Sequence, residues 1–279
     1  MNPQNGPLNR KTSFYYPFLL LPTEQRRAME SLYRYCWAAD DISDNNDPLP
    51  VKQRKLRAFK AELTRCFSGK PKEFLFQNLA ETFRRFNLSR KPLLSILEGV
   101  ARDLKPIRFQ KFQELHRYCL QVAGGPGLAS MEIFGYRDQP HRDYAKNLGV
   151  FLQIVNMTRD FREDMSLGRQ YFPSEDFKKF SLIPAAIGEK NSNWTLFVEF
   201  QLNRAWSYLE KSRNSLSLRQ RSRLATAEAI AAVYVKLFQR LRANPQKILE
   251  GKTSLSRSDK LLSVLGAAGR CFLWHWAVP

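Results

Sequence analysis

The chain has 279 residues, of which 43% are hydrophobic, and its 45 basic and 26 acidic residues give a net charge of +19. No Pro/Gly/Ser-rich linker or shift in composition divides it, so we expect one domain over residues 1–279, with a core of about residues 12–270. The positive charge indicates attraction to polyanions, which include nucleic acid, anionic lipid and phosphorylated substrates, but does not choose among them.

Helical periodicity dominates the chain, and no convincing run of alternating residues predicts a strand. The predicted helices begin near Thr23 and then cover residues 52–66, 74–86, 91–103, 109–122, 127–134, 141–165, 194–212, 219–243 and 259 to the end. Three basic runs, at residues 52–57, 84–91 and 204–223, do not show the regular interleaving of basic and aromatic residues that is typical of nucleic-acid motifs. We therefore expect an all-α fold with solvated basic helix faces and no nucleic-acid partner.

One predicted helix reaches a run of small residues, Gly124-Gly125-Pro126-Gly127. Because proline lacks an N–H donor and clashes with the preceding turn, we expect the helix to break or kink there. Two interpretations remain. The run is either a simple connection or a place where missing side chains leave room for a long apolar ligand, beside residues Val122, Leu128, Ala129 and Met131.

The cysteines and the two ends of the chain bear on its compartment. Four cysteines at positions 36, 66, 119 and 271 are far apart, which favours neither a disulfide framework nor a zinc site and fits a reducing cytoplasm. The N-terminal apolar run is too short and too proline-bounded for a signal or membrane-spanning segment. At the C-terminus, Trp274 and Trp276 beside Arg270 indicate either a last helix packed on the core or contact with a lipid interface.

Two acidic clusters about 120 residues apart continue the apolar stripes of predicted helices. In the first, Ala28, Leu32 and Cys36 step by four, and Asp40 and Asp44 prolong that row, with Asp41 alongside. The second cluster repeats the pattern, and its row changes from apolar to amide to acid at Leu148, Leu152, Asn156, Asp160 and Asp164, with Glu163 alongside.

Acids placed in this way are costly unless a cation compensates them. Two ionised carboxylates about 6 Å apart repel each other by roughly 3 kcal/mol at an effective dielectric constant near 20. Oxygen ligands of this kind suit Mg²⁺, which keeps several waters and bridges one or two carboxylates to a substrate phosphate. Ordinary solvated acids near helix ends are the alternative for either cluster alone, but the shared pattern favours a diphosphate held through magnesium.

The residues resemble the squalene and phytoene synthases, which condense two prenyl diphosphates head to head. The resemblance covers nearly the whole chain, from SFYYPFLLLP (residues 13–22) through DDISD (40–44) and YCLQVAGGPG (118–127) to NMTRDFREDMSLGRQYFP (156–173). The family's N-x-x-R-D-x-x-x-D pattern falls on Asn156, Arg159, Asp160 and Asp164. The resemblance implies a single-domain all-α isoprenoid synthase fold with a central cavity.

Residue roles follow from the resemblance alone. It implies metal ligation by Asp40, Asp44, Asn156, Asp160 and Asp164, and the catalytic set comprises these four aspartates with the cavity tyrosines Tyr118 and Tyr234. Substrate binding is assigned to Ser13, Phe14, Asp41, Gln153, Asn156, Arg159 and Glu163. The implied cofactor is Mg²⁺, with Mn²⁺ as a substitute, and NADPH is not expected for the first half-reaction. The implied partners are prenyl diphosphates, with peripheral contact at an anionic membrane.

The chain departs from the family at one position. Family members commonly have arginine where this chain has Trp37, so a cation that could hold diphosphate is absent there. Arg34, one turn earlier, or Lys11 in the N-terminal segment could take its place.

Three readings of the function follow. The sequences SFYYPFLLLP and LSRSDKLL look most like bacterial presqualene diphosphate synthases, which use farnesyl diphosphate. Phytoene synthases, which use geranylgeranyl diphosphate, share much of this pattern and are the alternative. From a different class, a non-catalytic basic helical scaffold stays open. We expect a cytoplasmic protein that contacts the inner face of the membrane.

Overall fold

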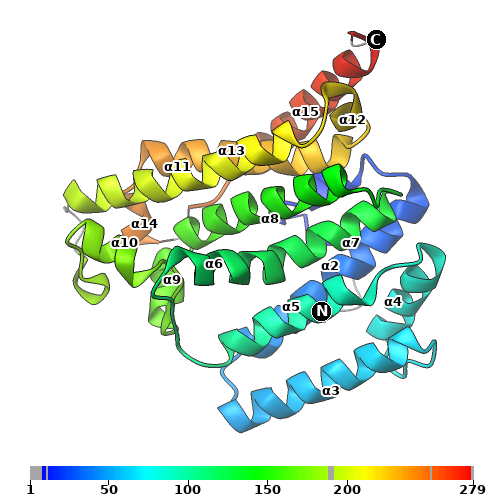
Figure 1. The fold of residues 1–279 in the computed structure, drawn as a ribbon, viewed down its shortest axis with the longest axis horizontal. Coiled ribbons are helices and arrows are strands. Elements are labelled where there is room, and N and C mark those ends of the chain that lie inside the picture. Colours follow the sequence, from blue (N-terminus) through cyan, green and yellow to red (C-terminus); the bar gives the residue numbers. More distant parts are fainter. Residues whose placement is uncertain (1–7, 11, 188–191, 252, 278–279) are drawn as a thin grey trace.

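The computed structural model describes residues 8–10, 12–187, 192–251 and 253–277. It consists almost entirely of helices packed side by side (Figure 1), so the all-α prediction is confirmed. The first helices are α1 (Tyr15–Phe18), α2 (Thr23–Asp44), α3 (Leu49–Phe67), α4 (Phe74–Arg85), α5 (Arg90–Asp103) and α6 (Phe112–Cys119). After the π-helical segment η1 (Leu120–Gly124) come α7 (Gly125–Ile133), α8 (Gln139–Arg159), α9 (Phe161–Ser166), α10 (Ser174–Lys179), the 3₁₀ turn η2 (Pro184–Ala186), α11 (Ser192–Asn214), α12 (Leu218–Ser222), α13 (Ala225–Ala243), α14 (Lys247–Glu250) and α15 (Arg257–Ala277).

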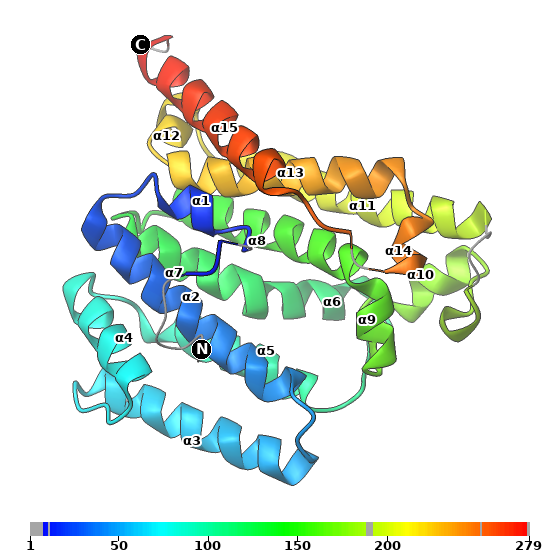
Figure 2. The same ribbon diagram turned by 180° about the vertical axis from the view of Figure 1, so that it is seen from behind.

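Helix α8 lies in the middle of the bundle. It begins at the N-cap Asp138, whose carboxylate accepts a hydrogen bond from the backbone N–H of His141 at 3.2 Å. It packs against α7, α11 and α13, and its central residues, including Phe151 and Ile154, are completely buried. Figures 1 and 2 show α11 and α13 on one side of it and α6 and α7 on the other. The end of α8 is therefore held at the centre of the molecule, where the second acidic cluster follows.

The small-residue run neither ends the helix nor forms a loop. Leu120–Gly124 adopts π-helical hydrogen bonding, so helical structure continues from Phe112 to Ile133, and Pro126 falls in the first turn of α7, where its missing N–H costs little. The predicted interruption of the α-helix therefore takes the form of a π turn, which accommodates the proline, and not of a break in the helical structure. The absent side chains serve close packing: a Cβ on Gly125 would lie 2.9 Å from the carbonyl oxygen of Pro92, and one on Gly127 would lie 3.0 Å from that of Ala145 in α8.

Other boundaries differ from the predictions. The helix predicted over 141–165 is two helices, α8 and α9, which meet at Asp160, and the one predicted over 219–243 is α12 and α13. Two short strands, β1 (Ile107–Arg108) and β2 (Arg169–Gln170), form a parallel pair that the sequence did not predict. This pair joins the segment after α5 to the segment after α9, and it places Arg169 near the end of α5.

The predicted solvated basic faces are partly wrong. Arg204 of α11 forms an ion pair with the buried Asp176 at 2.6 Å, and Arg221 forms one with the buried Glu228 at 2.9 Å.

The four cysteines are free thiols, as expected for a chain without a disulfide framework. Within the described ranges, no helix combines the length and the hydropathy needed to cross a bilayer.

Candidate active site

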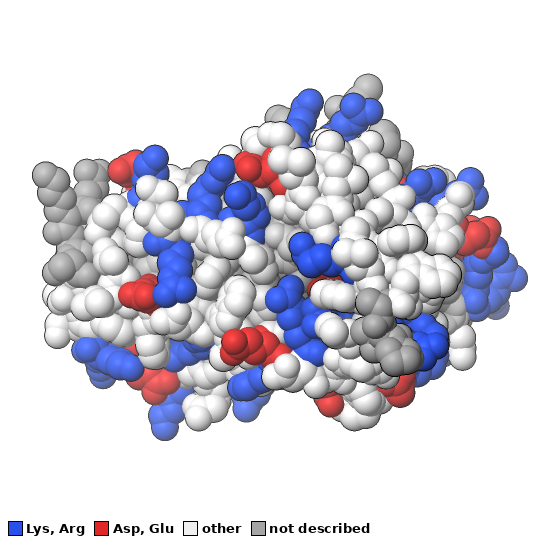
Figure 3. All heavy atoms as spheres, turned by 90° about the horizontal axis from the view of Figure 1, so that it is seen from above, with Lys and Arg blue, Asp and Glu red and all other residues white. Residues whose placement is uncertain are grey.

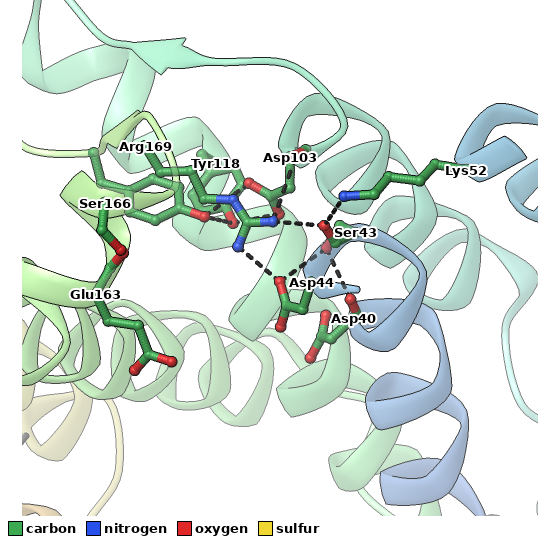
Figure 4. Close-up of polar contacts among 10 residues, drawn as sticks. Asp40, Ser43, Asp44, Lys52, Asp103, Tyr118, Glu163, Ser166 and Arg169 are labelled. Atoms are coloured by element: carbon green, nitrogen blue, oxygen red, sulfur yellow. Dashed lines mark hydrogen bonds and ion pairs between the residues drawn. The ribbon is translucent and has the colours of Figure 1, made fainter. Parts of the chain in front are cut away.

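The first acidic cluster occupies the C-terminal end of α2. Asp40 and Asp44 lie on its last turns, and the Oδ1 atom of Asp44 accepts a hydrogen bond from Nη1 of Arg169 at 2.7 Å (Figure 4). The Nη2 atom of Arg169 donates to the carbonyl oxygen of Ser43 at 3.0 Å. Lys52 donates to the same carbonyl at 2.8 Å. Two cations therefore hold the end of α2, where unpaired helix carbonyls carry partial negative charge.

The second acidic cluster surrounds the break between α8 and α9. Asp160 stands between the two helices, and the side chain of Arg159 donates two hydrogen bonds to its carboxylate, at 2.8 and 2.5 Å. Asp164 follows one turn later in α9. This bidentate pair fixes the Arg159 guanidinium at the rim of the acidic region.

A third acid, Asp103 at the end of α5, was missed by the sequence analysis. Its carboxylate accepts hydrogen bonds from the hydroxyls of Tyr118, at 2.7 Å, and Tyr171, at 2.8 Å. The two tyrosine rings stack with centroids 5.1 Å apart. The signal was available, because Ile96 and Val100 form an apolar row that Asp103 extends, as in the two recognised clusters.

The three acidic segments enclose a polar cavity of about 310 Å³. It carries five carboxylates and two guanidinium groups, from Asp40, Asp44, Asp103, Asp160, Asp164, Arg159 and Arg169. Tyr118 also lines it, whereas Asp41 and Glu163 are exposed and line neither this cavity nor its neighbour. The predicted set of four aspartates, with Arg159 and Tyr118, is thus brought together in one place.

A second cavity, of about 580 Å³, adjoins the polar one and is mostly apolar. Asp40, Val122, Gln153, Asn156 and Arg159 line both, so the two form one continuous site. The apolar walls include six aromatic side chains, Phe14, Phe18, Tyr33, Trp37, Phe134 and Tyr234. Ser13 lines it as well, as does Met131, whereas Leu128 and Ala129 from the predicted apolar pocket do not. The combined shape accommodates a molecule with an anionic head and a long apolar chain.

Burial without enough positive charge raises the pKa values of the acids. The pKa of Asp40 rises to about 8, first because of desolvation and then because of repulsion from Asp44 and Asp103, although solvent still reaches the side chain through the cavity. The pKa of Asp164 also rises to about 8, through desolvation and repulsion from Asp160. The pKa of Asp103 rises to about 6, because desolvation outweighs the hydrogen bonds from its tyrosines.

The squalene/phytoene synthase family profile matches residues 9–259. The chain belongs to this family. Its relatives include a chloroplast phytoene synthase of an Oncidium hybrid cultivar, 29% identical over 94% of this chain and 65% of that protein. A 15-cis-phytoene synthase of Synechococcus elongatus is 30% identical over 73% of this chain and 71% of its own length.

Solved structures of the squalene/phytoene synthase family share the fold. A dehydrosqualene synthase in complex with a ligand superposes with a TM-score of 0.77 at 23% identity, covering 92% of this chain and 90% of that one. The isoprenoid synthase fold expected from the resemblance is therefore confirmed.

The polar cavity fits the divalent ion that the squalene/phytoene synthase fold implies. Its acids outnumber its cations, and the Oδ1 atom of Asn156 is buried without a hydrogen-bond partner, which is unusual for a buried amide oxygen. Among the described residues, no three acidic, histidine or cysteine side chains converge enough to enclose an ion by themselves. That arrangement suits Mg²⁺, whose remaining ligands are waters and substrate phosphate oxygens.

The missing family arginine is not replaced by Arg34. That side chain pairs with Glu30 at 3.4 Å and lines neither cavity, while Lys11 lies outside the described residues. Trp37 is half-buried in the wall of the apolar cavity. The guanidinium groups of Arg159 and Arg169 are the arginine cations that line the polar cavity in the described part of the chain.

Proposed function

We propose that this protein condenses two molecules of farnesyl diphosphate to presqualene diphosphate in a magnesium-dependent reaction. The observation that carries the proposal is the continuity of the two cavities: an apolar, aromatic-walled chamber runs directly into a polar one that holds five carboxylates. An allylic diphosphate fills such a site with its chain in the first and its head group in the second.

In this proposal the acids of the polar cavity supply the ligands of the metal. Asp40, Asp44, Asp160, Asp164 and the unpaired amide oxygen of Asn156 are the groups that would hold it. When bound, Mg²⁺ neutralises the charge that develops on a departing diphosphate. The remaining chemistry depends on what the protein side chains do.

Two arginines and a set of aromatic side chains suit the two halves of the reaction. Arg159 and Arg169 present fixed guanidinium groups to the polar cavity, where they bind diphosphate oxygens and stabilise the leaving group. Ionisation breaks the allylic C–O bond, and the electron pair leaves with the diphosphate. The aromatic faces of the neighbouring chamber, including Tyr33, Trp37 and Tyr234, stabilise the allyl cation and exclude water.

The second substrate completes the bond formation. Its double bond attacks the cation, and loss of one proton closes a cyclopropane ring. Two farnesyl diphosphates thus give presqualene diphosphate, one diphosphate and one proton. The product retains one diphosphate, and no electrons are transferred, so this half-reaction needs no NADPH.

Phytoene synthesis from geranylgeranyl diphosphate is the second candidate. It is favoured by the sequence relatives, which are phytoene synthases, whereas the resemblance of residues 13–22 and 255–262 to presqualene diphosphate synthases favours the shorter substrate. The cytoplasmic location, the absence of a nucleic-acid partner and contact with an anionic membrane remain predictions.

Magnesium-dependent release of diphosphate tests whether the protein is a catalyst at all. We expect release from farnesyl diphosphate with Mg²⁺ or Mn²⁺, and none with EDTA. A scaffold without catalysis would release none under any condition and would bind nucleic acid in a strongly salt-dependent manner.

A further inference from the structure

The solvent-exposed side of the last helix, α15, is apolar. Its buried side, with Val264, Ala267 and Cys271, packs against α13 and α12. The opposite side exposes large apolar side chains. These are Leu261, Leu262, Leu265, Phe272, Leu273 and Trp276, which are 42, 68, 57, 65, 63 and 74% exposed.

The exposed side of α15 also lacks charge. At about 100° per residue, these six side chains together with Ser258, Gly266 and Gly269 occupy an arc of about 140° that contains no charged residue. A surface helix normally shows the reverse pattern, with charged residues facing outward. Because a quarter of this chain is charged, an uncharged outer face five turns long indicates that something covers it.

Basic residues border this outer face. Arg257 and Arg270 are exposed on α15 itself, on either side of the apolar arc, and Arg219 and Arg223 are exposed on or just after α12, which contacts α15. The one acid of α15, Asp259, is paired with Arg240 at 3.0 Å. Figure 3 looks onto the side of the molecule from which α15 rises, and Lys and Arg predominate there around uncharged surface.

The position of α15 connects it to the apolar cavity. It packs on α13 and α1 (Figure 2), and these two helices or the residues beside them supply Phe14, Phe18, Ile230 and Tyr234 to the cavity wall. Leu19 and Leu20, directly after α1, are also exposed. The uncharged face thus lies on the outer side of the helices that line the apolar chamber.

We propose that the apolar face of α15 docks in the surface of an anionic membrane. The features required are all present: an apolar face with leucine, phenylalanine and tryptophan, a basic border, and a helix that does not cross the bilayer. A second copy of the chain is the less suitable occupant, because it would bring the same basic border and the same +19 charge against itself. The proposal holds whichever prenyl diphosphate is the substrate.

Vesicle flotation of the full chain tests the docking surface. We expect the protein to float with vesicles of phosphatidylcholine containing one-third phosphatidylglycerol, to bind neutral vesicles much more weakly, and to be released by high salt. The double variant Phe272→Ser/Trp276→Ser should bind the anionic vesicles at least about tenfold more weakly, since both side chains insert below the head groups. A matched control, Phe74→Ser/Ile183→Ser, removes two side chains that are 55 and 70% exposed elsewhere and should bind normally.

Three further readouts keep the outcomes distinct. Diphosphate release by the Phe272→Ser/Trp276→Ser variant in vesicle-free buffer should equal that of the wild type, because neither residue lines a cavity. Tryptophan emission of the wild type should shift to the blue on addition of anionic vesicles. Equal flotation of the variant and the wild type would overturn the proposal. So would a stable wild-type dimer that the variant dissolves, because α15 would then be a subunit interface.

Discussion

Replacing Asp40 with asparagine should make the metal-free protein more stable and, at the same time, nearly inactive. Asp40 lines both cavities, and its pKa is raised from 3.8 to about 8 by desolvation and by its acidic neighbours. Each pKa unit corresponds to ~1.4 kcal/mol, so this rise makes ionisation of the Asp40 carboxyl about 6 kcal/mol more costly in the folded protein than in the unfolded one. Solvent reaches the side chain, and screening reduces the cost to about 1 to 2 kcal/mol.

The sign of the stability effect follows from the direction of the pKa shift. Because the folded pKa lies above the unfolded one, the folded protein binds the extra proton, and its stability falls as pH rises from about 4 to about 8. Asparagine never ionises and avoids this loss. We therefore expect Asp40→Asn to melt about 2 to 6 °C higher than the wild type at pH 9, with a smaller difference at lower pH.

Activity should move in the opposite direction. Removing one preorganised charged group from such a site commonly lowers turnover at least about a hundredfold, so Asp40→Asn should lose that much magnesium-dependent diphosphate release. Melting is followed by circular dichroism in EDTA, and turnover by diphosphate release across a magnesium titration. Asp47→Asn, at a surface carboxylate paired with Lys55, is the matched control and should change neither. Near-normal turnover of Asp40→Asn, or a lower melting temperature at pH 9, would refute the reasoning.

Three other predictions concern the same site. Arg169→Gln leaves Asp44 without its 2.7 Å partner and should lower turnover at least about tenfold in the diphosphate-release assay, with unchanged turnover contradicting the role of Arg169. Trp37→Arg should be tolerated, because a guanidinium one turn from Asp40 compensates that acid; a large fall in melting temperature without tighter substrate binding would show that Trp37 is only a packing residue. Magnesium binding near neutral pH should release protons from Asp40 and Asp164, so the calorimetric enthalpy should depend on the ionisation heat of the buffer, and a buffer-independent enthalpy would contradict the raised pKa values.

The acidic clusters could be predicted because they interrupt a regular pattern. Asp40 and Asp160 each continue a row of apolar residues at helical spacing, and that departure from ordinary amphipathicity is visible in one sequence. Asp103 carries the same signal in the row of Ile96 and Val100. Its signal is weaker because Asp103 stands alone, without the neighbouring acids that mark the other two clusters.

Arg169 could not be assigned from local sequence. Its position depends on the parallel pairing of β1 with β2, a two-residue contact between segments about 60 residues apart that leaves no periodic signal. The guanidinium reaches Asp44 on a third element, α2. Long-range pairing of this kind is set by the packing of α5, α9 and α2 around one cavity and not by the propensities of the residues concerned.

The run from Gly124 to Gly127 shows a different limit. Glycine and proline usually predict that a helix ends, but that rule assumes that the helix has α-helical hydrogen bonds throughout. The π-helical segment Leu120–Gly124 changes the bonding so that Pro126 enters a new first turn, and Gly127 allows the backbone of Ala145 in α8 to approach closely. Backbone-to-backbone packing of this kind decides the conformation, and it is not visible in a single segment.

Product analysis with farnesyl and geranylgeranyl diphosphates, each with Mg²⁺ and with or without NADPH, tests the central claim most directly. The proposal predicts that farnesyl diphosphate with Mg²⁺ alone gives diphosphate and presqualene diphosphate. Phytoene or prephytoene diphosphate from the longer substrate, with little turnover of the shorter one, would contradict it and establish the phytoene synthase alternative.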